Sequence, residues 1–164
     1  MIPLSVKMLI FSKILSSLLD FFPFSLEDEK LKASKTIAHG FNEKNIIIFE
    51  VVLLKDRHIR LFLGKLKEKM GVELRQKIIS QAGTRLDDTL DFFLRFDKKS
   101  WMEGKKLVLT DLGECFHIKI NVAAFPKKKE IALSIIKSIF QNQRVFYPYF
   151  DLKCIKNVNN KIII

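Results

Sequence analysis

The spacing of apolar residues changes along the chain, and each change predicts a new element. Leucine and phenylalanine recur at helical spacing up to Phe22, and Pro23 then ends this first helix. Residues 31–38 and 45–54 predict two strands, since β-branched side chains fill half of the second segment. The beginning of the chain therefore predicts one helix followed by two strands.

The middle of the chain predicts two helices in succession. Asp56 caps the first, whose apolar residues face inward while its cations face water, and Gly71 ends it. The second helix covers residues 72–82. Both are amphipathic, so both are expected to pack on a common core.

Three short strands follow, over residues 92–98, 105–110 and 115–122. Apolar side chains alternate with polar or mixed ones in each, which gives every strand one apolar and one mixed face. Pro126 then opens a last helix that carries an apolar stripe up to Phe140.

This order, α-β-β-α-α-β-β-β-α, predicts an α+β fold. Short connections favour a mainly antiparallel sheet with the helices on its apolar face, a two-layer sandwich with one open sheet face. Residues 1–141 suit a single domain, and residues 142–164 differ in composition and read as a C-terminal tail or an added strand. We expect residues 145–164 to pair with the sheet, or two chains to associate through it.

Charge narrows the choice of partner. The 29 lysines and arginines outnumber the 18 acids and give a formal net charge of +11. Such a balance favours an anionic partner, nucleic acid first and an acidic membrane surface second. The surface chemistry of a lysine-rich proteome would raise glutamate together with lysine, so it does not account for the imbalance.

Cations concentrate in the predicted three-strand region and at the start of the last helix. Residues 98–129 contain eight lysines and three acids, and flexible cations in number are what phosphate contact requires. A helix N-terminus attracts anions as well. The candidates for phosphate contact are Arg95, Lys98, Lys99, Lys106, Lys119, Lys127, Lys128 and Lys129.

Several neighbours of these cations have two interpretations. Asp97 either orients Arg95 or forms a plain surface ion pair with it. Phe93 either stacks on an unpaired base or is covered by a tail or partner. Trp101 is expected to be a packing anchor, and His117 a polar surface residue.

The sequence contains no recognisable catalytic or metal-binding motif. Cys115 and Cys154 form no CxxC pair, and no histidine has metal-ligand spacing to them. Glycine-rich phosphate loops and hydrolase motifs are missing too, so we expect no enzyme, cofactor or metal. Charges interrupt the apolar segment 4–22, which favours a cytoplasmic protein without a membrane anchor or signal.

Four motifs in this order resemble an archaeal RNA-binding-domain family described as predicted exosome-associated subunits. They are Leu94-Arg95-Phe96-Asp97-Lys98, Gly104 before a strand, His117-Ile118-Lys119-Ile120 and Ala124-Phe125-Pro126-Lys127-Lys128. The resemblance covers about residues 12–140 and implies a fold similar to the ribosomal large-subunit protein that contacts 5S rRNA. It also implies partners among RNA-processing subunits. The family opens with a strand, for which residues 1–5 leave little room.

The sequence therefore predicts a non-catalytic RNA-binding protein that contacts phosphates with a basic open sheet face and a helix N-terminus, in a role accessory to RNA processing. The alternative is a protein-interaction or homodimerisation module whose basic charge is incidental. A third interpretation is membrane association through residues 4–22.

Overall fold

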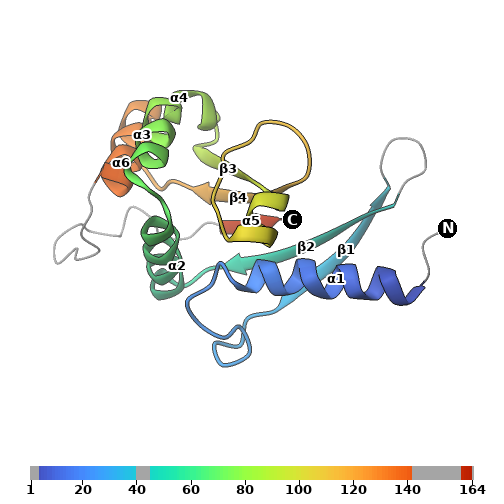
Figure 1. Ribbon diagram of the computed structural model, residues 1–164. Helices are drawn as coiled ribbons and strands as arrows, with labels where there is room; N and C mark the ends of the chain where they lie inside the picture. Colours follow the sequence, from blue (N-terminus) through green and yellow to red (C-terminus); the bar gives the residue numbers. More distant parts are fainter. Residues whose placement is uncertain (1–3, 40–44, 142–159, 164) are drawn as a thin grey trace.

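A computed structural model describes residues 4–39, 45–141 and 160–163 of the chain (Figure 1). The helices are α1 (Leu4–Leu19), α2 (Asp56–Lys69), α3 (Val72–Ser80), α4 (Ala82–Arg85), α5 (Lys98–Gly104) and α6 (Lys129–Gln141). The strands are β1 (Ala33–His39), β2 (Asn45–Leu53), β3 (Asp91–Asp97), β4 (Cys115–Asn121) and β5 (Asn160–Ile163). The predicted α+β class is confirmed.

The strands form two antiparallel pairs, β1–β2 and β3–β4, which are not hydrogen-bonded to each other. β5 lies between them, antiparallel to both β2 and β4, which gives the order β1-β2-β5-β4-β3. The prediction of one sandwich sheet built from successive strands is therefore wrong. Within the described ranges, the two pairs are joined by β5 alone, a four-residue strand from the predicted C-terminal tail.

The predicted strand over residues 105–110 is also wrong. This segment makes a single bridge to β3, between Leu109 and Phe96, and the chain first forms the unpredicted helix α5. The side chain of Asp97 caps α5 by accepting a hydrogen bond from the Ser100 amide at 2.7 Å. The cap turns the chain directly from β3 into a helix, which leaves the next residues as an edge segment.

The core lies between the helices and one face of the two strand pairs. Phe92, Leu94 and Phe96 of β3 are buried there, and Trp101 of α5 is buried beside them. The Trp101 indole donates to the backbone oxygen of Ser17 at 2.7 Å and its ring stacks on Phe21. Trp101 is thus a packing anchor, as predicted.

The helices divide between the two ends of the molecule (Figure 1). α1 runs alongside the β1–β2 hairpin, while α3, α4 and α6 cluster beside the β3–β4 pair, where α3 packs on α6. α6 begins at Lys129 and not at Pro126, so two of the three predicted helix-terminal lysines precede the helix. Among the described residues, no helix has both the length and the apolar character needed to cross a membrane.

Candidate nucleic-acid interface

Four side chains form a two-by-two array on the face of β3–β4 that points away from the core. Phe93 lies opposite Lys119 and Arg95 lies opposite His117, and all four are half-buried. The Lys119 amine lies 5.8 Å from the centre of the Phe93 ring, and the Phe93 and His117 rings are 5.4 Å apart. We call this array the β3–β4 face. The strand period places all four on one face, where rings and cations alternate.

Lys119 is held by a buried carboxylate. Its amine lies 2.6 Å from Oδ2 of Asp91, whose side chain is only 9% exposed, whereas that of Lys119 is 32% exposed. Asp91 also accepts hydrogen bonds from Thr89 and Asn121. These bonds fix the lysine over the Phe93 ring, so its position is set by the fold and not by solvent.

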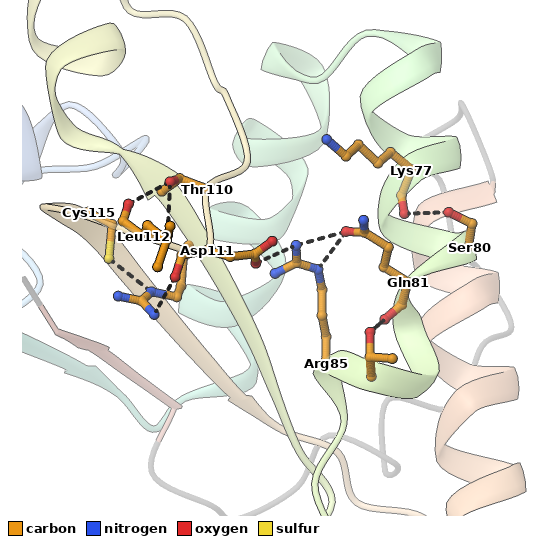
Figure 2. A network of polar contacts seen from close by, with 10 residues as sticks. Lys77, Ser80, Gln81, Arg85, Thr110, Asp111, Leu112 and Cys115 are labelled. Atoms are coloured by element: carbon orange, nitrogen blue, oxygen red, sulfur yellow. Dashed lines mark hydrogen bonds and ion pairs between the residues drawn. The ribbon is translucent and has the colours of Figure 1, made fainter.

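Arg95 is held by the loop that precedes β4. Its guanidinium donates to the Cys115 sulfur at 3.2 Å and to the Asp111 backbone oxygen at 3.3 Å. Figure 2 shows the Asp111 carboxylate facing Arg85 of α4, whose guanidinium lies 3.3 Å away and also donates to Gln81. One loop residue therefore touches two arginines.

Asp97 does not pair with Arg95, so both predicted roles for this carboxylate are wrong. Its Oδ2 accepts hydrogen bonds from the amide and the hydroxyl of Ser100, and these bonds hold the Asp97 pKa below its usual value. The sequence carried a signal for this role, since Asp is among the residues favoured at a helix N-cap.

His117 carries little positive charge in this setting. Burial lowers its pKa below the ordinary value, and the charges of Arg95 and Lys119 lower it further. The imidazole is therefore a mostly neutral ring at pH 7. An incoming phosphate would raise its pKa again, because the phosphate offsets the two cations.

Lys98 and Lys99 lie on the first turn of α5. Lys98 is paired with Glu114 at 3.2 Å, whereas Lys99 is exposed and makes no ion pair among the described residues. Asp111 and Glu114 thus belong to one exposed segment, residues 111–114, that contacts several cations. We call this segment the acidic loop.

The three lysines near α6 differ in their partners. Lys129 lies 3.6 Å from the Asp88 carboxylate. Lys127 and Lys128 are exposed and form no ion pair with any described residue. They follow Phe125 and Pro126 in a connection that we call the 125–128 loop, where the Phe125 side chain is 93% exposed.

Lys106 lies apart from the β3–β4 face. It lines an open cleft of about 1020 Å³ on the helix side, between the start of α3 and residues 104–109. The prediction from sequence missed the three other lysines of this cleft, Lys69, Lys77 and Lys105, since they come from separate elements. Lys105 is paired with Asp20, and Lys69 and Lys105 both lie over the Trp101 ring.

The structure therefore brings together only part of the predicted set. Arg95 and Lys119 share one face, Lys98 and Lys99 lie beyond the end of β3, and Lys127 to Lys129 lie beyond the end of β4. Sequence reasoning also missed the exposure of Phe125. Within the described ranges, no three histidine, cysteine or acidic side chains could together hold a metal ion.

The sequence matches a known protein family over the residues that form this surface. Residues 11–122, which include the whole β3–β4 face, match the model of a family described as RNA binding. The chain is 26% identical over 131 residues to RNA-binding protein PAB1135 of Pyrococcus abyssi, an alignment covering 80% of this chain and 84% of that protein.

Two solved structures are similar over most of their length. Mth689 of Methanothermobacter thermautotrophicus, described as a DUF54 protein, is 26% identical with a TM-score of 0.62, covering 79% of this chain and 86% of that one. AF2318 of Archaeoglobus fulgidus is 24% identical with a TM-score of 0.69, covering 78% and 87%. The second likeness shows the fold alone.

Proposed function

The chain belongs to the RNA-binding family whose model it matches, and on that premise we propose that it binds RNA through the β3–β4 face without catalysing a reaction. The observation that carries the proposal is the two-by-two array of Phe93, Arg95, His117 and Lys119. Cations beside half-buried rings can contact phosphates while a ring edge or face meets an unstacked base.

The lysines around this face extend the proposed contact. Lys99, Lys127 and Lys128 are exposed and free of ion pairs among the described residues, so phosphates can replace water around them at little cost. Lys98 and Lys129 would exchange a carboxylate for a phosphate. Lys106 would contribute only if the RNA also reached the helix side.

Salt dependence of affinity tests the proposal. Contact with five or six phosphates predicts a log–log slope between about −4 and −5 for a labelled oligoribonucleotide. Fluorescence anisotropy at several salt concentrations measures it. A flat response to salt would contradict phosphate contact.

Two double variants that each remove two positive charges test whether the RNA contacts the β3–β4 face. Arg95→Gln/Lys119→Gln should weaken binding about tenfold or more and make the slope shallower by about two phosphates. Lys32→Gln/Lys137→Gln removes the same charge from exposed positions elsewhere and should change affinity much less. Equal losses in the two variants would mean that net charge, and not this face, attracts the RNA.

A second candidate function is association with another chain through β1. This strand is one edge of the sheet, and five of its seven residues are exposed. An unpaired edge can add a strand from a partner. Sedimentation of the protein without RNA distinguishes this function, because self-association through β1 would be insensitive to RNA. A role beside RNA-processing subunits, implied by the family resemblance, would use the same edge.

A further inference from the structure

Two large apolar side chains are the most exposed on the described surface, and the charged residues near them have opposite signs. Phe125 is 93% exposed and precedes Lys127 and Lys128 by two and three residues. Leu112 is 83% exposed, but it lies in the acidic loop between Asp111 and Glu114. One surface therefore presents an aromatic ring beside cations and the other an aliphatic side chain beside acids.

The backbone on both sides of Phe125 is fixed by hydrogen bonds. The Val122 amide donates to the Leu90 oxygen at 2.9 Å, and the Ala132 amide donates to the Lys128 oxygen at 3.1 Å. Lys129 at the start of α6 also lies 3.6 Å from the exposed Asp88 carboxylate in the turn before β3, a contact that adds little to this anchoring. A ring presented by an anchored loop loses little conformational entropy when it binds.

We propose that Phe125 stacks on an unpaired RNA base while Lys127 and Lys128 contact the adjacent phosphates, which makes the 125–128 loop a single-strand binding site. The inference rests on the proposed function and names the form of RNA that this site takes. A phenylalanine ring offers a flat apolar face to any base, so stacking there requires no particular sequence.

The loop also lies within reach of the β3–β4 face. Phe125 lies six positions after Lys119, so their Cα atoms are at most about 22 Å apart. A single strand of a few nucleotides can therefore contact both. Duplex bases are stacked on each other and present no free face to Phe125. The ring should discriminate between the two forms of RNA.

Phe125→Ala tests the stacking contact. Binding of a single-stranded oligoribonucleotide of about twelve nucleotides should weaken by about five- to a hundredfold, the range that loss of one stacked base produces. Binding of the same sequence as a duplex should change little. Leu112→Ala is the matched control, since it removes an equally exposed apolar side chain, and it should leave both affinities unchanged.

Phe125→Trp supplies a direct readout. The chain contains a single tryptophan, Trp101, which is buried, so the added emission reports on position 125. Saturating single-stranded RNA should quench that emission, and affinity should be retained. Unquenched emission, or wild-type affinity in Phe125→Ala, would overturn the inference.

Two other outcomes separate this inference from the proposed function. If the wild-type protein binds no RNA, the proposed function fails and the stacking site with it. If Phe125→Ala binds RNA normally but sediments differently from the wild type, the ring contacts a protein chain and the stacking inference alone fails.

Discussion

The two faces of the β3–β4 pair both carry phenylalanine, but the surroundings of the ring differ. On the inner face, Phe92 is buried and packs near Phe140 of α6. On the outer face, Phe93 is half-buried between Lys119 and His117. The inner side chains touch helices, whereas the outer cations touch carboxylates and loop backbone. The alternation of a strand thus places core residues and the residues of the proposed RNA contact next to each other along the chain.

The largest expected effect comes from truncating, one at a time, two adjacent phenylalanines of β3 that point to opposite faces. Phe92→Ala should lower the free energy of unfolding by about 3–5 kcal/mol, because it opens a cavity in the core. Phe93→Ala should cost about 1 kcal/mol and weaken RNA binding. Urea denaturation and anisotropy measure the two quantities. If Phe93→Ala were the more destabilising variant, the assignment of the two faces would be reversed.

Lys119→Ala is expected to have an intermediate effect on stability. Its amine neutralises the buried Asp91, so truncation should cost about 1–2 kcal/mol, more than an ordinary surface change. Asp91→Asn added to Lys119→Ala should recover part of that loss, because the unpaired charge disappears. RNA affinity should stay low in both variants, since neither restores the cation. Recovery of binding in the double variant would contradict a phosphate contact at Lys119.

A smaller effect is expected from the acidic loop, in the direction of tighter binding. The Glu114 carboxylate pairs with Lys98, a cation that the RNA would use, and the Asp111 carboxylate pairs with Arg85 nearby; both carboxylates are largely exposed and would repel a phosphate. Asp111→Asn/Glu114→Gln should raise RNA affinity about two- to tenfold, since each exposed pair is worth less than about 1 kcal/mol. Glu103→Gln, an exposed acid of α5, is the control and should change affinity less. Unchanged affinity in the double variant would place the RNA away from this loop.

The smallest effect concerns His117 and pH. Its pKa is lower in the folded chain than in the unfolded chain, so the unfolded state binds more protons and stability falls as the pH drops through and below about 6.5. His117→Gln should make the free energy of unfolding less dependent on pH between about 8 and 5.5. Chemical denaturation at several pH values tests this, and an unchanged pH profile would mean that His117 does not titrate differently on folding.

The sequence predicted elements better than it predicted contacts. Alternation over residues 92–98 and 115–122 placed Arg95, Lys119 and Phe93 on a shared face before any register was known, because the strand period alone determines it. The same rule failed at 105–110, where alternation is present but only Leu109 bridges to β3. Periodicity cannot tell a paired strand from an extended edge segment.

Contacts between distant residues were beyond sequence reasoning. The Asp111 contacts to Arg85 and Arg95 and the Asp91 contact to Lys119 join residues that are 16 or more positions apart. Local patterns do not encode such pairs. The exposure of Phe125 was hidden for a related reason, since an aromatic before a helix is as compatible with a buried staple as with a solvent-facing ring.

The central position of β5 has a consequence for how the chain folds during synthesis. Among the described strands, β5 alone is hydrogen-bonded to both pairs, and 107 positions separate Leu53 of β2 from Asn160 of β5. Until β5 is made, β2 exposes one unpaired edge, and β4 exposes another once residues 115–121 have been synthesised. Such edges are templates for aggregation, and closing so long a loop is slow. The nascent chain is therefore expected to depend on chaperones until the last strand arrives.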